Sequence, residues 1–152
     1  MEVFSRLKSI FPEKEVEFYR LTDDESSWII YVPKCFSSTV QEFDEFWSHR
    51  PKHRPNGKIM GKNVEFPRYT LAFGKDYTFS GQTAVSNEIS TMPSIATNAV
   101  QILSKAFSTQ NGVLINFYDA ETNDYIGLHR DNEKGLKLNA PIVSISWNTP
   151  NH

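Results

Sequence analysis

The sequence has one cysteine, no strong charge of either sign and no long apolar run. A single cysteine, Cys35, can form neither an internal disulfide nor a cysteine-rich zinc site, as is typical of a reducing compartment. The longest apolar run, Trp28 to Val32, has five residues, far fewer than the ~20 of a membrane-spanning helix. The N-terminal residues lack the apolar stretch of a secretory signal. We therefore expect a soluble intracellular protein, in the nucleus or the cytoplasm, with no membrane partner.

The positive charges gather in one segment, although the whole chain is nearly neutral. Lys and Arg number 16 and Asp and Glu 18, a formal net charge of -2, so the chain as a whole does not attract nucleic acid. Between residues 50 and 68, which we call the basic segment, six basic residues stand against one acid. The basic residues are Arg50, Lys52, Arg54, Lys58, Lys62 and Arg68, and the acid is Glu65. Turn residues at 55–57 and Gly61 predict a loop and a short hairpin. This segment is either a phosphate-contacting arm or a solvated surface loop.

The periodicity of apolar residues predicts one mixed domain. With 39% hydrophobic and 13% aromatic residues, the 152 residues suffice for one core. The expected helices cover residues 3–11, a stretch from an N-cap at Ser38 to Pro51, and a stretch from a cap at Thr91 towards Gly112. The expected strands are 28–32, which should be buried, strands within 69–79, and strands at 113–118 and 141–147. The expected fold class is therefore α+β.

His129 and Asp131 carry the most specific chemistry in the sequence. They lie two residues apart, so in an extended strand both side chains leave the same face and can chelate one ion. Imidazole and carboxylate are ligand types of the facial triad that binds non-haem Fe(II). With Arg130 the pair also matches the start of a protein-kinase catalytic loop, but the Asn that a kinase needs five residues after the Asp is Leu136 here. From this pattern alone, a surface His and Asp in a turn remains the alternative.

The surroundings of the pair add family information. Asn116 and Tyr118 precede it in a predicted strand, and a Pro-Ile-x-Ser-x-Ser motif at 141–146 follows it. In this order, the three motifs resemble the AlkB family of Fe(II)- and 2-oxoglutarate-dependent dioxygenases. Residues 66–81 resemble the substrate-side segment of the family members that repair double-stranded DNA in animal nuclei. The resemblance implies a double-stranded β-helix, a jelly-roll-like core with N-terminal helices packed on the sheet. It also implies oxidative demethylation of N-alkylated bases, such as 1-methyladenine and 3-methylcytosine.

The resemblance further implies roles for individual residues. His129 and Asp131 would bind Fe(II), and Asn116 and Tyr118 would hydrogen-bond 2-oxoglutarate, the cosubstrate used with O2. Ser144 would support the wall of that pocket. The residues implied for alkylated DNA or RNA are Arg68 and Ser80 in the substrate-side motif, Phe79 stacking on a flipped base, Tyr77 hydrogen-bonding near it, Glu133 at the base edge and Met60 as an apolar wedge. For Tyr77 and Phe79, which alternate along a strand, ordinary packing in the core is the alternative.

We expect a single domain over 1–152, divided into a lead-in of helices and strands at 1–50, nucleotide-recognition hairpins at 51–90, and a helix with the first part of the β-helix at 91–152. The family core extends further beyond the His-x-Asp pair than the 21 residues after Asp131, and supplies a third histidine ligand and an arginine for 2-oxoglutarate. His152 comes too early to be that ligand, so we expect a C-terminally incomplete core. One hypothesis is a monomeric repair dioxygenase whose sequence has been cut short. A second is a non-catalytic or decayed AlkB-like nucleic-acid-binding protein, and a third is a family enzyme acting on RNA or protein.

Overall fold

The chain forms short sheets flanked by three helices, in a computed structural model that describes residues 2–24, 26–79, 81–107, 110–129, 131, 136 and 140–148. The elements in chain order are α1 (Glu2–Ile10), β1 (Glu17–Arg20), β2 (Trp28–Tyr31), α2 (Val40–Ser48), β3 (Asn56–Ile59), β4 (Lys62–Glu65), β5 (Tyr69–Phe73), β6 (Tyr77–Phe79), β7 (Gln82–Ala84), β8 (Ser86–Asn87), a 3-10 turn η1 (Ile89–Thr91), α3 (Ser94–Leu103) and β9 (Val113–Phe117). The predicted α+β class is confirmed. No helix in the described part of the chain is long and apolar enough to span a bilayer.

Helix α2 begins one residue later than the sequence predicted. Its N-cap is Thr39, whose Oγ1 accepts a hydrogen bond from the Glu42 backbone N–H at 3.2 Å, while Glu42 Oε2 accepts from the Thr39 N–H at 2.8 Å. This reciprocal pair is a capping box. The prediction of Ser38 as the cap was wrong, because Thr39 is the residue that exchanges hydrogen bonds with the residue three positions later, Glu42.

Helix α3 has a different cap and a shorter span than predicted. Its N-cap is Pro93, and Thr91 belongs to the preceding 3-10 turn, where its hydroxyl donates to the Glu88 carbonyl at 2.8 Å. The helix ends at Leu103, well before Gly112. After that residue the backbone changes to tighter bonds, such as Ala106 N–H to Leu103 O at 2.9 Å, as commonly happens in a last turn.

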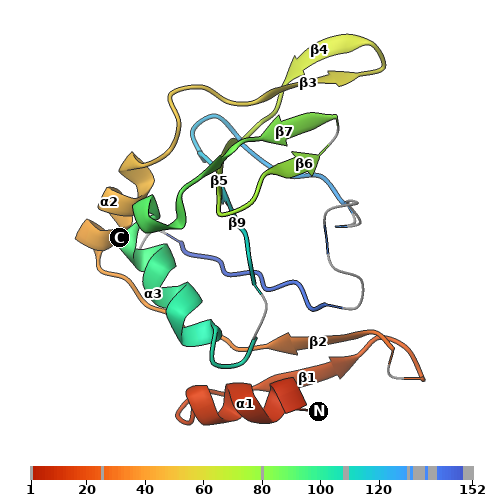
Figure 1. The fold of residues 1–152 in the computed structure, drawn as a ribbon, viewed down its shortest axis with the longest axis vertical. Helices are drawn as coiled ribbons and strands as arrows, with labels where there is room; N and C mark the ends of the chain where they lie inside the picture. Colours follow the sequence, from red (N-terminus) through yellow and green to blue (C-terminus); the bar gives the residue numbers. More distant parts are fainter. Residues whose placement is uncertain are drawn as a thin grey trace.

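The basic segment contains the predicted hairpin, with its turn at Met60 and Gly61. In the β3–β4 ladder Ile59 pairs with Lys62, so a two-residue loop joins the strands. Met60 and Gly61 have φ values of 50° and 80°, which is the requirement of a type I′ turn. Residues 55–57, also predicted to turn, instead lead into and begin β3. Figure 1 shows this hairpin projecting at the end of the molecule opposite α1.

Strand β5 is the centre of a three-stranded sheet, parallel to β8 and antiparallel to β9. One core cluster joins this sheet to α2 and α3, which lie together on one side of it in Figure 1. Its buried members are Phe46, Phe73, Met92, Ala96, Ile115 and Phe117. Of the N-terminal helices predicted to pack on the sheet, α2 does so, together with α3, whereas α1 does not.

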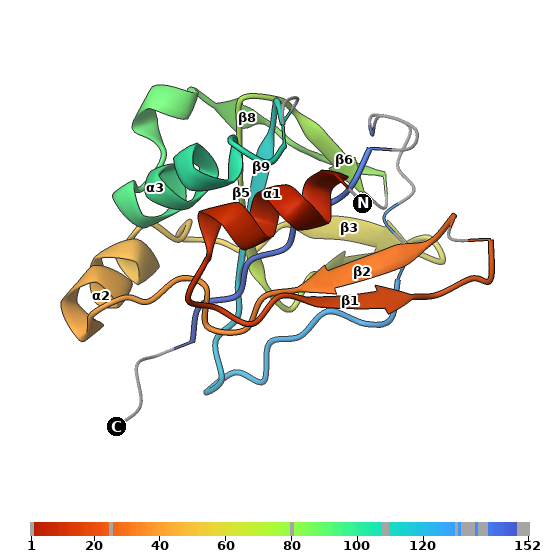
Figure 2. The same cartoon turned by 90° about the horizontal axis from the view of Figure 1, so that it is seen from below.

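Helix α1 belongs to a second cluster, away from that sheet. Leu7 and Phe11 pack with Ala106, beyond the end of α3, and with Ile30 of β2. Figure 2 shows α1 lying over the β1–β2 hairpin. Strand β2 is not buried as predicted, since Trp28, Ile29 and Tyr31 are exposed. Among the described residues of β2, Ile30 is the one that packs against the cluster.

Residues 141–147, predicted as a strand, belong to no ladder among the described residues. Their side chains still alternate, with Ile142, Ser144 and Ser146 exposed and the residues between them half-buried. Trp147 packs against Phe46, with ring centroids 5.5 Å apart. The expected period of two is thus present without the hydrogen-bonded neighbour that defines a strand.

Candidate functional site

Asn116 and Tyr118 leave the same side of β9 and its extension. Ile115 and Phe117 point into the core, so Asn116, between them, faces the opposite way. It pairs in register with Thr70 of β5, and Thr70 Oγ1 donates to Asn116 Oδ1 at 3.0 Å. The amide oxygen is therefore occupied and the Asn116 NH2 group is left as a donor.

Tyr118 follows β9 directly and is 40% exposed. Burial of part of its ring raises the pKa of the phenol, and the positive charge of Arg68 acts in the opposite direction. The net rise keeps the hydroxyl protonated at neutral pH, so Tyr118 also presents a donor. Two donors on one face suit a carboxylate ligand.

Arg68 lies beside Tyr118 within a group of aromatic rings. Its guanidinium carbon is 5.3 Å from the Phe66 ring centroid and 5.1 Å from that of Phe79, and its Nε is buried with no hydrogen-bond partner among the described residues. Phe79 is 8% exposed, and its centroid lies 5.6 Å from that of Phe66 and 6.0 Å from that of half-buried Tyr77. These positions match the core-packing alternative. Ser80 lies outside the described residues.

The His-x-Asp pair lies in irregular chain, since neither residue belongs to a strand among the described residues. The two side chains nevertheless face each other, with His129 Nε2 3.4 Å from Asp131 Oδ1. His129 Nδ1 is 2.9 Å from the Gly127 carbonyl. A carbonyl only accepts, so Nδ1 carries a proton, and Nε2 is the ring nitrogen that faces the carboxylate.

This arrangement fits two ligands of one cation. Ligand atoms about 2.1 Å from a metal ion and at right angles lie about 3 Å apart, close to the observed separation. A histidine that binds a metal commonly donates its other ring N–H to a backbone carbonyl or a carboxylate, which fixes the orientation of the ring. In the described part of the chain, no group of three His, Cys, Asp or Glu residues could hold a metal, so a third protein ligand is not supplied there. Glu133 lies outside the described residues.

Ser144 is exposed, and no hydrogen bond joins it to Asn116 or Tyr118 among the described contacts. Met60 is 97% exposed at the tip of the β3–β4 hairpin. Lys58 and Lys62, on either side of the tip, are also exposed. The hairpin thus presents an apolar side chain between two cations.

The arginines of the basic segment are used differently from its lysines, which the sequence did not predict. The Arg50 guanidinium lies 4.8 Å from the Trp47 ring, and that of Arg54 lies 4.7 Å from the Tyr69 ring. Arg54 also pairs with Asp124, Nη2 to Oδ1 at 2.9 Å. These arginines are partly enclosed, whereas Lys52, Lys58 and Lys62 are exposed. This difference between the arginines and the lysines depends on contacts with residues that are distant in the sequence, such as Asp124.

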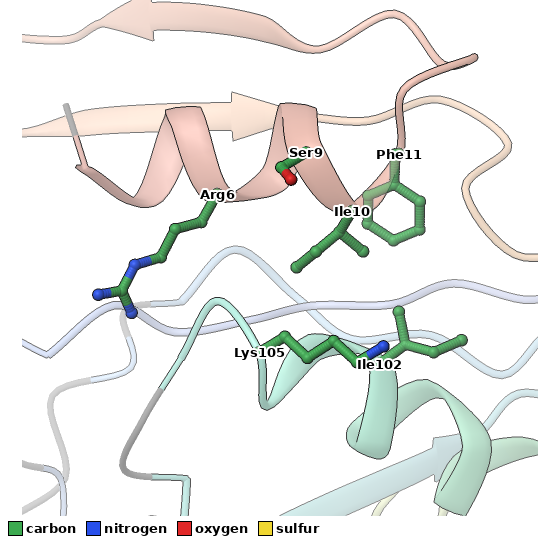
Figure 3. A pocket seen from close by; sticks show the side chains of 6 residues that line it. All are labelled: Arg6, Ser9, Ile10, Phe11, Ile102 and Lys105. Carbon is green, nitrogen blue, oxygen red and sulfur yellow. The ribbon is translucent and has the colours of Figure 1, made fainter.

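Two cavities lie elsewhere. One of about 540 Å³ separates α1 from the end of α3 and is lined by Arg6, Ser9, Ile10, Phe11, Ile102 and Lys105. Figure 3 shows the side chains of the two helical segments facing each other across it. A second, of about 390 Å³, borders the same helix. Neither includes a residue of the predicted site.

Comparisons with known proteins agree with the motifs. The model of the 2OG-Fe(II) oxygenase superfamily matches residues 34–150. "DNA oxidative demethylase ALKBH2" of Bos taurus is 34% identical over 94 residues, 59% of this chain and 32% of that protein. The protein of the same name from Mus musculus is 30% identical over 118 residues, 75% of this chain and 46% of that protein. The chain spans less than half the length of these curated relatives.

The superfamily match covers most of the chain, including the Asn-x-Tyr segment, the His-x-Asp pair and the Pro-Ile-x-Ser-x-Ser motif. The chain therefore belongs to the 2OG-Fe(II) oxygenase superfamily and resembles its AlkB-type members.

Proposed function

We propose that the chain provides part of the active site of an Fe(II)- and 2-oxoglutarate-dependent dioxygenase that removes N-alkyl groups from DNA bases. The observation that carries the proposal is the His129–Asp131 pair, with donor atoms 3.4 Å apart and the far ring nitrogen on the Gly127 carbonyl. Family membership and the names of the two relatives support this chemistry. We further propose that the β8–β5–β9 sheet is part of a double-stranded β-helix, and that the protein acts as a nuclear or cytoplasmic monomer.

In this proposal, His129 and Asp131 hold the iron. When bound, Fe(II) with 2-oxoglutarate and O2 supplies the oxygen atom that hydroxylates the N-methyl carbon, which leaves as formaldehyde, while 2-oxoglutarate becomes succinate and CO2. Asn116 and Tyr118 donate hydrogen bonds to the 2-oxoglutarate carboxylate, and Ser144 supports the pocket wall.

The substrate side consists of Met60 as a wedge, Arg68, Tyr77 and Phe79 around the base, and Ser80 and Glu133. The Arg68 guanidinium now lies over the Phe79 ring, so a stacked base has to displace it. Base stacking on an aromatic ring contributes ~1–3 kcal/mol, which offsets part of the cost of flipping the base.

The test is product formation. The protein that contains this chain, assayed at its full length with Fe(II), 2-oxoglutarate and an oligonucleotide containing 1-methyladenine, is expected to release formaldehyde and succinate in equal amounts. His129→Ala and Asp131→Ala should abolish both products while leaving the circular dichroism spectrum unchanged. An unmethylated oligonucleotide is the control for turnover without substrate. If the parent releases no formaldehyde, or if the two variants retain it, the proposal is wrong.

A non-catalytic nucleic-acid-binding protein is the second candidate, favoured by the exposed Met60 and lysines of the hairpin. It predicts salt-dependent oligonucleotide binding without turnover. Each lost phosphate contact lowers the slope of log affinity against log salt by ~0.7–0.9, so Lys58→Gln and Lys62→Gln should each reduce it by about that amount. Lys105→Gln, beyond α3, is the control and should leave the slope unchanged.

A further inference from the structure

Arg54 connects the basic segment to a turn far away in the sequence. Its Nη2 donates to Thr122 Oγ1, 68 residues further along the chain, at 2.6 Å, and to Asp124 Oδ1 at 2.9 Å. The guanidinium also lies 4.7 Å from the Tyr69 ring centroid, and the side chain is 17% exposed. Such a stacked and hydrogen-bonded guanidinium is fixed at several points.

The turn that Arg54 contacts is held together by two hydrogen bonds between Asp119 and Asp124. The Asp124 N–H donates to the Asp119 carbonyl at 3.0 Å, and the Asp119 N–H donates to Asp124 Oδ2 at 3.1 Å. The Asp124 carboxylate is only 2% exposed, so Arg54 neutralises a buried charge. The next residue, Tyr125, donates its N–H to the Pro67 carbonyl at 2.9 Å, which adds a second tie to the basic segment.

This turn joins the two halves of the candidate site. It begins directly after Tyr118 and leads to His129, so its position sets the distance between the 2-oxoglutarate donors and the iron ligands. Residues 120–123 and 125–129 are exposed and contribute little apolar packing. Segments with few buried apolar contacts open readily, so the polar ties are what holds this segment in place.

We propose that Arg54 is a positioning residue: through Asp124 and Thr122 it fixes the 119–125 turn, and thereby the placement of His129 and Asp131 relative to Asn116 and Tyr118. The effect on the iron ligands rests on the proposed function, whereas the anchoring of the turn by Arg54 does not depend on a metal. In this proposal Arg54 supports the candidate site and does not bind phosphate, whereas the exposed lysines of the same segment remain available for phosphate.

The experiment compares Arg54→Gln with Arg50→Gln. Both remove one positive charge from the basic segment and one guanidinium near the Tyr69 ring, but only Arg54 bonds to the turn. Amide hydrogen exchange is followed at Asp119, Asp124 and Tyr125, whose N–H groups are hydrogen-bonded. Arg54→Gln should accelerate their exchange by about tenfold, and Arg50→Gln should leave it unchanged.

The second measurement tests whether the turn places His129 and Asp131 correctly. It is the affinity of the protein for Co(II), followed by the absorption of the bound ion. Arg54→Gln should weaken Co(II) binding by about tenfold, as the loss of a residue that orients a metal ligand commonly does, and Arg54→Lys should restore part of the affinity. Asp124→Asn, which keeps the shape of the turn and removes the charge, should reproduce the exchange result if Arg54→Gln does not fold.

The outcomes separate the two proposals. Equal exchange rates in the parent, Arg54→Gln and Asp124→Asn would overturn the anchoring, whatever the metal does. Accelerated exchange with unchanged Co(II) affinity would overturn the positioning role. A parent that binds no Co(II), or binds it equally after His129→Ala, would contradict the proposed function while the exchange data still decide the anchoring.

Discussion

Replacing Thr70 with Val tests whether the pairing of β5 with β9 orients Asn116 for the proposed binding of 2-oxoglutarate. Thr70 Oγ1 donates to Asn116 Oδ1 at 3.0 Å in a partly buried position, and in the proposed site this bond leaves the amide NH2 group to face 2-oxoglutarate. Val has nearly the same shape but no hydroxyl, so the substitution removes the bond and little packing. A neutral hydrogen bond of this kind is worth about 1 kcal/mol, which corresponds to about a fivefold change in a dissociation constant.

The assay is anaerobic titration with 2-oxoglutarate in the presence of Mn(II), by calorimetry. Thr70→Val should weaken 2-oxoglutarate binding about fivefold, whereas Thr70→Ser, which keeps the hydroxyl, should bind like the parent. The free energy of unfolding should fall by about 1 kcal/mol or less, because the high strand propensity of Val offsets part of the lost hydrogen bond. If Thr70→Val binds 2-oxoglutarate as tightly as Thr70→Ser does, the reasoning about the Asn116 amide is refuted.

Three further predictions concern stability, each measured by urea unfolding. A Cβ at Gly57 would lie 2.4 Å from Phe66 Cζ, so Gly57→Ala should lower the free energy of unfolding by about 1–3 kcal/mol through overpacking; a smaller change would mean that the ring moves aside freely. Thr39→Ala removes the capping box and should cost about 1 kcal/mol, whereas Ser38→Ala should be nearly neutral; equal costs would contradict the assignment of the cap. Burial alone would raise the pKa of Asp124, but hydrogen bonds from the Asp119 N–H and the Arg54 guanidinium outweigh it and lower the pKa. Its contribution to stability is therefore present above the ordinary carboxyl pKa of about 4 and lost as the pH falls below it, and Asp124→Asn should remove this part of the acid dependence.

Local sequence signals predicted the elements whose causes are local. The helix at 3–11 ends before Pro12, and the strand at 113–118 contains a run of apolar residues, so both were found with small errors at their ends. The hairpin of the basic segment was found through Gly61, since its turn requires positive φ. The ladder missing at 141–147 shows the limit of this approach, because alternation indicates an extended chain and not the presence of a neighbouring strand.

The sequence by itself determined the family, because the His-x-Asp pair and the motifs around it are close together in the chain and specific in type. The same two-residue spacing places His129 against Asp131 even in irregular chain. Tertiary structure alone decided which side chains of the basic segment are free. Arg54 is enclosed by Asp124 and Tyr69, whereas Lys58, four residues later, is exposed on a hairpin. That difference arises from partners brought together by folding, and the local composition of the segment gives no sign of them.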